Sequence, residues 1–316
     1  MSDTTTLSNK NILVIGGAGF IGTNLVRELC KINSKVIVLD NFSVGSKESL
    51  KGFDVEIIEG DITVVNDFKK INSDVDYIVN LAAYSNFWKC EKDSSTAFKI
   101  NVQGTFNVFK FGLERNVKKV LFPSSCLIYG KHPKYLPQDE KHPIEFADSV
   151  YTTTKKIGED MAAMFHEKFK LPVTWFRFFN NYGPGQQADY FIPTLIIQAM
   201  KNKEIELWST KPIRDYIYVG DTVNALIKGL ISDFSGGPIN IGSGIETSTG
   251  DVAKQVAEMF DAKLRVLDKE VGGPLRQRCD YSFAKTVLGW EPIVKFGDGL
   301  KETIEWWKRQ INLSTS

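Results

Sequence analysis

Tyr151 and Lys155 are the two residues of this sequence whose types and spacing most directly suggest chemistry. They lie four positions apart in "YTTTK", and the pattern of residues 149–170 predicts a helix that carries both side chains on one face. A phenol with a pKa near 10 is a poor base at neutral pH, but a neighbouring ammonium favours its ionised form. Lowering that pKa to about 7 or 8 requires roughly 3 to 4 kcal/mol, which one close cation in a partly buried site can supply. The pair therefore predicts a general acid/base.

A second motif, "GGAGFIG", spaces Gly16, Gly19 and Gly22 evenly at the point where an apolar run gives way to a helical pattern. The first glycine permits a tight turn, the second lets backbone amides approach a pyrophosphate, and the third allows the helix to pack closely on the strand. Alone, the pattern could be an ordinary glycine-rich turn. Its place in a strand–helix–strand unit near the N-terminus predicts a dinucleotide-binding loop.

Acidic residues after the next two strand patterns indicate which dinucleotide is bound. Asp40 ends "KVIVLD", and a carboxylate at that place can accept hydrogen bonds from both ribose hydroxyls and would repel a 2′-phosphate. NAD is therefore favoured over NADP. In "GDIT", Asp61 and Ile62 are candidate partners for the amino group and the face of the adenine, although an ordinary loop would also explain them.

The elements that must position these residues alternate between short runs rich in Val and Ile and longer amphipathic stretches. Strands are predicted in "NILVIGG", "KVIVLD", "VEIIEGD", "VDYIVNLAA", "KKVLFPSS" and "VTWFRFFN", and crossover helices in "IGTNLVRELCKI", "VVNDFKKI", residues 93–116 and residues 149–170. This order is typical of an α/β fold built on a Rossmann-type doubly wound parallel sheet.

The pattern changes after Tyr182, where a stretch with its own helix and short strand is followed by "RDYIYVGDTVNALIKGL" and "PINIG", which again resemble sheet and helix. The C-terminal part is therefore expected to be a smaller substrate domain interleaved with the first. The boundaries that follow are residues 1–180 plus about 215–243 for the NAD-binding domain, and about 181–214 plus 244–316 for the substrate domain.

Composition argues against several classes of partner. The 39 Lys and Arg residues balance 38 Asp and Glu, so no excess charge indicates nucleic acid or an anionic membrane. The first ten residues lack the regions of a secretory signal, and no apolar run approaches the roughly 18 residues of a membrane span, so a cytoplasmic protein is expected. No metal site or disulfide framework is indicated by the cysteines, which are Cys30, Cys90, Cys126 and Cys279.

The order of the motifs resembles that of a known family over nearly the whole chain. "GGAGFIG", "LDNFSVGS", "GDIT", "LAA", "NVQGT", "SSCLIYG", "YTTTK", "RFFNNYGPGQ", "RDYIYVGD", "NIGSG" and "LGWEP" follow the pattern of extended short-chain dehydrogenases/reductases, in the NAD-dependent nucleotide-sugar epimerase/dehydratase branch that includes UDP-glucose 4-epimerases. The resemblance implies tightly held NAD. It assigns cofactor contacts to Gly16, Gly19, Phe20, Ile21, Gly22, Asp40, Asn41, Asp61, Ile62, Leu81, Ala82, Ala83, Asn101, Tyr151 and Lys155.

The resemblance also implies catalytic roles. Ser125, four positions before the tyrosine of "IYG", would hydrogen-bond the reacting sugar hydroxyl while Tyr151 takes its proton and hydride passes to NAD. Lys155 would bind the nicotinamide ribose as well as polarise Tyr151. Asn101 would shape the helix and the proton relay behind them, and Ser124 is interpreted as scaffolding at the strand end.

Substrate-binding residues are expected in the last part of the chain. The resemblance implies that Asn180 holds the sugar or the diphosphate, with Asn181 as the adjacent alternative. Arg214 resembles the family's phosphate-binding arginine, a role that suits a planar fork of donors. A second phosphate arginine is expected in "GGPLRQRCDYS", first at Arg276 and next at Arg278.

Cys126 and Leu127 occupy the positions at which 4,6-dehydratases of sugar nucleotides carry an aspartate and a glutamate. Leucine cannot abstract a proton, which argues against an ordinary dehydratase, whereas epimerisation at C4 asks nothing further of the protein. The favoured activity is therefore a UDP-sugar 4-epimerase that forms a transient 4-keto intermediate. Two interpretations of Cys126 stay open: a thiol acid/base in a C3/C5 epimerase or dehydratase, or a small packing residue.

One segment departs from the family pattern. "AAYSNFWKCEKDS" places Phe87, Trp88 and Lys89 where relatives often have a small, serine-containing substrate loop, which indicates either an unusual sugar or helix packing. Further along, Trp208 in "IELWST" is a candidate for stacking on the nucleobase or for packing.

Functions of two other classes fit this sequence less well than an epimerase does. A simple NAD(P)H-dependent ketone reductase fits less well because Asn180 and Arg214 indicate a diphosphate substrate, and a non-catalytic binding protein fits less well because Ser125, Tyr151 and Lys155 are intact. The family resemblance further suggests a homodimer in which the helices of Asn101 and Tyr151 pack against the partner's pair.

Overall fold

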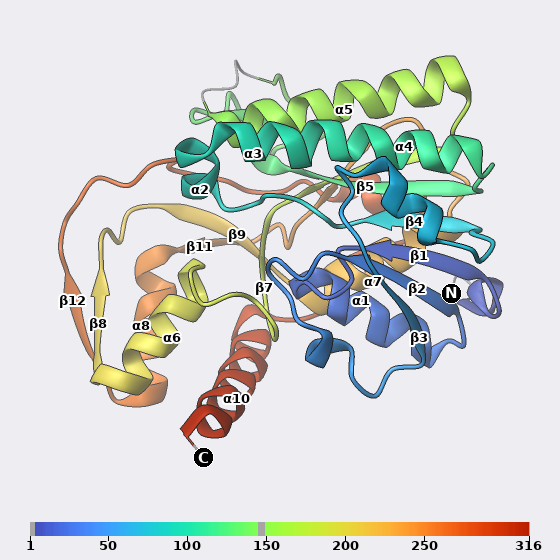
Figure 1. The fold of residues 1–316 in the computed structure, drawn as a ribbon. Coiled ribbons are helices and arrows are strands. Elements are labelled where there is room, and N and C mark those ends of the chain that lie inside the picture. Colours follow the sequence, from blue (N-terminus) through green and yellow to red (C-terminus); the bar gives the residue numbers. More distant parts are fainter. Residues whose placement is uncertain (1–3, 145–148, 316) are drawn as a thin grey trace.

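The computed structural model describes residues 4–144 and 149–315 of the 316-residue chain. Residues 1–3, which belong to the N-terminal segment in which no secretory signal is expected, lie outside the described residues. Its centre is a seven-stranded parallel sheet in the order β10-β6-β5-β4-β1-β2-β3 (Figure 1). The strands are β1 (Asn11–Ile15), β2 (Lys35–Asp40), β3 (Val55–Glu59), β4 (Tyr77–Asn80), β5 (Lys119–Ser125), β6 (Val173–Phe178) and β10 (Pro238–Ile241). The predicted doubly wound sheet is confirmed.

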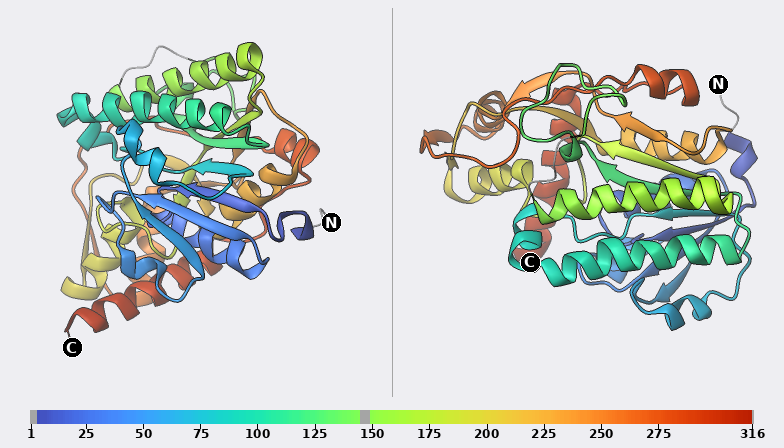
Figure 2. Two further views of the ribbon diagram at one scale, coloured as in Figure 1. Left: turned by 45° about the vertical axis from the view of Figure 1, so that its right-hand side comes forward. Right: turned by 90° about the horizontal axis from the view of Figure 1, so that it is seen from above.

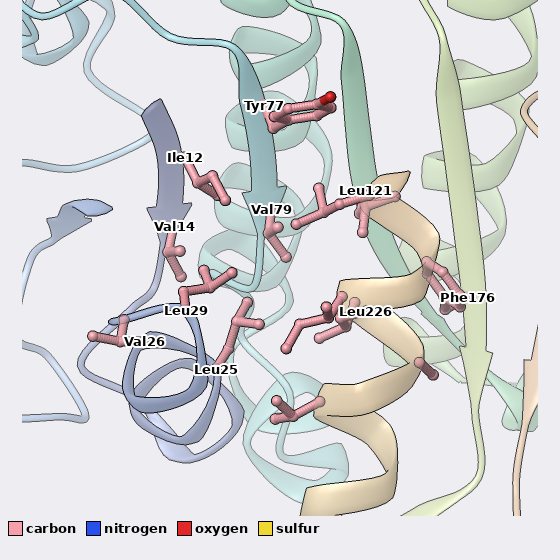
Figure 3. Close-up of a cluster of buried hydrophobic side chains, with 14 of the residues drawn as sticks. Ile12, Val14, Leu25, Val26, Leu29, Tyr77, Val79, Leu121, Phe176 and Leu226 are labelled. Atoms are coloured by element: carbon pink, nitrogen blue, oxygen red, sulfur yellow. The ribbon is translucent and has the colours of Figure 1, made fainter. Parts of the chain in front are cut away.

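Helices cover both faces of this sheet (Figures 1 and 2). One face carries α4 (Thr105–Glu114) and α5 (Val150–Phe169), and the other carries α1 (Phe20–Lys31), α7 (Val219–Ile231) and α9 (Ser282–Leu288). On the α1/α7 face, Val14, Val79 and Leu121 of three neighbouring strands pack with Leu25 and Leu226 (Figure 3). Burial on both faces explains why the strands read as continuous apolar runs.

Two predicted crossover helices differ in form from the expectation. Residues 65–70 form a short 3-10 helix, a common connector, instead of an α-helix. The segment 93–116 is divided into α3 (Ser94–Phe98), a π-helical turn (Lys99–Gly104) and α4. Gly104 allows this turn to lie against Ile62, because a Cβ there would come within 2.5 Å of the Ile62 side chain. The π-helical turn contains Asn101.

The remaining elements form a smaller lobe, which lies to the left of the sheet in Figure 1. It contains the three-stranded sheet of β7 (Asn180–Tyr182), β9 (Ile213–Tyr218) and β11 (Glu246–Ser248), and the pair β8 (Glu204–Leu207) and β12 (Lys263–Val266). Its helices are α6 (Phe191–Asn202), α8 (Thr249–Phe260) and α10 (Phe296–Thr315). Ile196, Leu207, Val252 and Leu300 belong to its separate hydrophobic core. The chain leaves this lobe to form α7 and β10 and then re-enters it.

Within residues 4–144 and 149–315, no helix is both long enough and apolar enough to cross a membrane. The same described residues contain no cluster of three or more His, Cys, Asp or Glu side chains with the arrangement of a metal site.

Candidate active site

The glycine loop joins β1 to α1 through close backbone contacts. Gly16 has a positive φ of 74°, and a Cβ there would lie 2.7 Å from the backbone nitrogen of Ala82. A Cβ on Gly22 would lie 2.2 Å from the Gly16 carbonyl oxygen. Both positions therefore require glycine. Gly19 begins α1 without a side-chain cap, so the positive end of the helix, at Phe20 and Ile21, suits the pyrophosphate of a dinucleotide.

Asp40 lies at the end of β2 beside this loop. Its carboxylate accepts hydrogen bonds from the backbone N–H groups of Ala18 (2.9 Å) and Phe42 (2.8 Å). These bonds fix the carboxylate against the glycine loop, and each of its oxygens keeps a lone pair with which a ribose hydroxyl could bond. The adjacent Asn41 donates to the Asp61 carboxylate at 3.0 Å, which joins the ends of β2 and β3.

Asp61 is held as an ionised acceptor at the end of β3. Burial alone would raise the pKa of this carboxyl, but hydrogen bonds from Thr63 and Asn41 outweigh burial and lower the pKa. Ile62 is buried beside it. These positions fit the expected partners of the adenine, and the assignment stays a prediction.

Leu81, Ala82 and Ala83 follow β4 and pass directly behind the glycine loop. The Leu81 N–H donates to the Ile15 carbonyl at 2.8 Å, which continues the β1–β4 ladder past the strand. Asn80, which replaces the usual histidine of the family, is buried, and neither of its amide atoms has a hydrogen-bond partner among the described residues. Orphaned polar atoms at this edge of the sheet are consistent with a nearby ligand site.

Asn101 connects the segment after β4 to the helix of the acid/base pair. Its amide accepts from the Tyr84 N–H (2.7 Å) and donates to the Tyr84 carbonyl and to the Thr154 hydroxyl (both 3.0 Å). Thr154 lies on α5, one turn beyond Tyr151. With all three bonds made inside the protein, Asn101 positions these segments, and its predicted parts in cofactor binding and in a proton relay stay predictions.

Ser125, Tyr151 and Lys155 come together where β5 ends and α5 begins. The Ser125 hydroxyl and the Tyr151 phenol are joined by a side-chain hydrogen bond. The Lys155 ammonium lies 5.8 Å from the centroid of the Tyr151 ring and donates to the Pro123 carbonyl at 2.8 Å. The structure thus brings together the three residues that the sequence singles out for catalysis.

The electrostatics of the trio differ from the simple expectation. Burial raises the pKa of Tyr151, and the hydrogen bond with Ser125 opposes only part of this effect. Burial also lowers the pKa of Lys155 to about 8, although the charges of Cys90 and Glu159 oppose it. Burial therefore penalises the charged forms of both groups. That Lys155, helped by the positive nicotinamide, lowers the pKa of the phenol stays a prediction. The positive nicotinamide ring of NAD would supply the additional charge that favours the phenolate.

Ser124, next to Ser125, faces a different environment. Its hydroxyl donates to the buried Glu159 carboxylate at 2.5 Å, and Glu159 forms a two-pronged ion pair with Arg177 on β6 (2.9 and 2.7 Å). Arg177 also donates to the Tyr129 hydroxyl at 3.0 Å. These contacts support the interpretation of Ser124 as scaffolding. The ion pair was not anticipated, and the only sequence signal is a lone arginine in the apolar run "VTWFRFF".

Cys126 lies in a small buried cluster with Tyr129, Phe179 and Cys279. Its sulfur accepts a hydrogen bond from the Gln277 amide at 3.2 Å, and Gln277 in turn accepts from Asn180 at 3.3 Å. Burial, followed by the charge of Asp215, raises the pKa of the thiol to about 12. Gln277 therefore links Cys126 to the predicted substrate residue Asn180. The sequence did not predict Gln277 as a site residue, because the two arginines beside it were the expected ligands of the phosphate.

The two predicted phosphate arginines have different surroundings. The Arg214 guanidinium is largely buried and donates to the Ile213 carbonyl at 3.1 Å, and none of the ion pairs formed by the described residues includes it. Burial lowers its pKa. By contrast, Arg276 is exposed and forms two hydrogen bonds of 2.7 Å with the Glu246 carboxylate. A buried cation without a carboxylate partner suits an anionic ligand, so Arg214 is the stronger of the two candidates, while Arg276 would have to exchange partners.

The other candidate substrate residues lie at the surface of the smaller lobe. The Arg278 side chain donates to the Gly244 carbonyl at 3.2 Å. Trp208 is half exposed, with the Lys269 ammonium 5.8 Å from its ring centroid. Neither position decides between ligand contact and packing.

Comparison with known proteins places this geometry in a family. Residues 12–242 match the model of the NAD dependent epimerase/dehydratase family. The chain belongs to this family. NAD is the family's cofactor, and the assignment of the glycine loop and of Asp40 at the end of β2 to its binding stays a prediction.

Members of the NAD-dependent epimerase/dehydratase family that resemble this chain differ in activity. This chain is 33% identical to UDP-glucuronic acid decarboxylase 6 of Arabidopsis thaliana, and the match covers 93% of this chain and 87% of the decarboxylase. A UDP-glucose 4-epimerase of Thermotoga maritima, solved with UDP-glucose, is 28% identical with a TM-score of 0.91 (95% and 99% covered). A dTDP-glucose 4,6-dehydratase of Streptomyces venezuelae, solved with NAD, is 27% identical with a TM-score of 0.90 (96% and 98% covered). The family is therefore certain, and the reaction must be argued from the site.

Proposed function

We propose that this protein epimerises a nucleotide-diphosphate sugar at C4, as a UDP-sugar 4-epimerase does, through a transient 4-keto intermediate. The observation that carries the proposal is the pairing of a complete Ser125, Tyr151 and Lys155 trio with the residues at the two positions after Ser125, since neither Cys126 nor Leu127 offers a ready acid/base. Leu127 has no ionisable group. The Cys126 thiol is buried, bonded to Gln277 and shifted to a pKa of about 12, which supports packing over proton transfer.

The trio has the parts that reversible oxidation of an alcohol requires. Ser125 would hold the C4 hydroxyl, Tyr151 would accept its proton, and Lys155 would bind the ribose next to the nicotinamide. NAD supplies the hydride acceptor and returns the same hydride, so no external reductant is consumed. Return of hydride and proton to the other face of the ketone inverts C4, and the smaller lobe must leave the sugar room to turn over.

Substrate contacts are assigned to residues at the junction of the two lobes. Arg214 would bind the diphosphate because it is a largely buried guanidinium without a carboxylate partner in the described part of the chain. Asn180 would bind the sugar or the diphosphate through its amide, positioned by the Asp215 carbonyl at 3.1 Å and by Gln277. Arg276 is retained as the second phosphate residue, dependent on release from Glu246.

Decarboxylation of a UDP-uronic acid is the second candidate, because a decarboxylase is among the similar relatives. Oxidation at C4 of such a sugar places a ketone β to the C5 carboxylate, so carbon dioxide can leave without a further base. Leu127 therefore argues against dehydration and leaves decarboxylation chemically open.

The deciding experiment incubates the protein, without added cofactor, with UDP-, GDP-, dTDP- and CDP-sugars, UDP-glucuronic acid included, in D₂O. Inversion at C4 without incorporation of deuterium, followed by NMR, is the expected result. Loss of carbon dioxide would establish the decarboxylase. Deuterium at C3, deuterium at C5 without loss of carbon dioxide, or loss of water would instead indicate Cys126 as an acid/base and overturn the proposal. Tyr151→Phe serves as the inactive control.

We also propose the architecture that the sequence predicts. The NAD-binding domain would comprise residues 1–180 plus about 215–243, and the nucleotide-sugar-binding domain about 181–214 plus 244–316, of which α9 packs back onto the parallel sheet. A homodimer would form through the helices of Asn101 and Tyr151, which expose apolar side chains, among them Phe98, Phe106, Met164 and Phe169. Phe106→Glu is expected to halve the mass measured by light scattering, and an unchanged mass would place the dimer contact elsewhere.

A further inference from the structure

The segment that departs from the family pattern connects the two lobes of the molecule. Asn86 caps α2 (Phe87–Lys92) by accepting the Lys89 N–H at 3.1 Å, and Cys90 anchors the helix by donating to the Tyr84 carbonyl at 3.1 Å. Trp88, at 58% exposure, is not buried by this helix. Helix packing therefore does not account for the polar and aromatic side chains on its outer face.

Those side chains instead contact the loop that leads into α6 of the smaller lobe. The Ser85 hydroxyl lies 2.9 Å from the Tyr190 hydroxyl. The Lys89 ammonium lies 2.9 Å from the Asp189 carboxylate, and Asn86 donates to the same carboxylate at 3.2 Å. We call Ser85, Lys89, Asp189 and Tyr190 the clasp.

A third segment reaches the same place. Gly272, in the loop before Arg276, lies beside the Trp88 ring, since a Cβ built on that glycine would be in ordinary van der Waals contact with the indole, at 3.5 Å. Two loops of the smaller lobe therefore lie against the segment that contains Trp88.

The clasp is attached to the catalytic centre through a short chain of contacts. Ser85 follows Tyr84, whose N–H and carbonyl are both held by Asn101, and Asn101 donates to Thr154 of the catalytic helix. Tyr190 of the smaller lobe is thereby joined, through Ser85, to the segment that Asn101 ties to the helix of Tyr151. In agreement with this placement, the charge of Tyr190 adds to the effect of burial in raising the pKa of Tyr151.

The strengths of these contacts suit a closure that opens on every turnover. The Lys89 and Asp189 side chains are 59% and 42% exposed. Exposed ion pairs contribute little, about 0.2–1 kcal/mol, so this pair cannot lock the lobes together. Its neutrality also matters, because an unpaired Asp189 carboxylate at the cleft would repel an anionic diphosphate.

We propose that Tyr190 is a positioning residue of the sugar pocket and that the clasp closes the cleft over Tyr151, so that the oxidised sugar stays bound until hydride returns. This inference rests on the proposed function, in which the C4 hydrogen leaves as hydride to NAD⁺ and the hydroxyl proton goes to Tyr151. If the ketone escapes before the return step, the sugar leaves oxidised by two electrons and the protein retains NADH. Weakening the clasp must therefore increase stranded NADH for each turnover.

The test uses the full chain with bound NAD and the nucleotide sugar that it binds most tightly in the panel above. Tyr190→Phe, Ser85→Ala and Asp189→Asn are compared with two controls remote from the clasp, Tyr77→Phe and Glu291→Gln, the latter removing the exposed Lys285–Glu291 pair. One readout is the NADH absorbance that accumulates per turnover. The other is the ratio of the dissociation constants of the nucleotide sugar and of its parent nucleoside diphosphate, measured by calorimetry.

Tyr190→Phe and Ser85→Ala are expected to raise the stranded NADH per turnover about fivefold, from the loss of one partly buried hydrogen bond, and Asp189→Asn about two- to fivefold. Tyr190→Phe should weaken binding of the sugar nucleotide and leave that of the nucleoside diphosphate unchanged. Values equal to wild type and to the controls on both readouts would overturn the clasp and leave the epimerase intact. If the wild type binds no sugar nucleotide, the proposed function fails, and the clasp with it.

Discussion

Ser124 and Ser125 are adjacent hydroxyls, and the structure predicts opposite consequences for their removal. Ser124 donates to the buried Glu159 carboxylate at 2.5 Å, whereas Ser125 is bonded to Tyr151 and accepts from the Leu127 N–H at 3.2 Å. Ser124→Ala should therefore lower stability and spare the chemistry. Ser125→Ala should lower kcat and have the smaller effect on stability.

The magnitudes follow from the partners. A hydrogen bond to a buried charged group contributes about 1.5–3 kcal/mol, which Ser124→Ala loses, while Arg177 still pairs with Glu159. With an unfolding entropy of about 2.1 cal/mol/K per residue, this chain loses about 2–5 °C in Tm. Ser125→Ala removes two neutral hydrogen bonds, one from the Leu127 N–H and one with Tyr151, each worth about 1 kcal/mol or less. It should lower kcat at least about 100-fold, because the substrate hydroxyl would no longer be held against Tyr151.

The assay measures Tm by calorimetry and kcat by sugar NMR for both alanine variants, at a temperature well below either transition. Ser125→Thr keeps a hydroxyl and should restore most of the activity. The reasoning is refuted if Ser124→Ala loses as much kcat as Ser125→Ala while fully folded, or if Ser125→Ala turns over like the wild type.

Three further outcomes are expected. Arg214→Met should weaken UDP binding about 100-fold by calorimetry, as expected for loss of two charge-assisted hydrogen bonds, whereas Arg276→Met, already paired with Glu246, should change it less than about threefold; similar losses would contradict the burial argument. Asp40→Ala should reduce the preference for NAD over NADP at least about tenfold in cofactor titrations, since a 2′-phosphate would no longer meet a carboxylate, and an unchanged preference would count against its role. The pKa of Lys155 is lowered to about 8 from its ordinary 10.5, so the folded state favours the neutral amine. This residue should therefore make the free energy of unfolding rise by about 2 kcal/mol from pH 8 to pH 10. Urea unfolding of Lys155→Met should lack that rise, and an equal dependence on pH in both proteins would refute the argument.

The sequence was sufficient for the sheet and for the cofactor loop because their signals are local. Continuous Val and Ile runs identify strands buried on both faces. The glycine spacing reflects backbone approaches that no larger residue allows, since a Cβ on Gly22 would lie 2.2 Å from the Gly16 carbonyl oxygen. Tyr151 and Lys155 could be paired in advance because four residues of helix place two side chains on one face.

What the sequence could not supply were contacts between residues far apart in the chain. The 3-10 form of residues 65–70 and the π-helical turn at Asn101 depend on neighbours such as Ile62, and the sign of the Tyr151 pKa shift depends on burial by the assembled lobes. The sequence does not distinguish the surroundings of Arg214 from those of Arg276. Only tertiary packing largely buries the Arg214 guanidinium and pairs Arg276 with Glu246.

The sequence by itself therefore determined the family and the cofactor and predicted the catalytic trio, since each depends on short motifs with fixed local geometry. The tertiary structure decided which serine supports Glu159, where the Cys126 thiol lies and how Lys89 meets Asp189 across the cleft. These depend on desolvation and on contacts between residues far apart in the chain, such as the 35 positions that separate Ser124 from Glu159 and the 105 that separate Ser85 from Tyr190. No local pattern encodes them, because the free energy of each contact depends on the surroundings that the whole fold creates.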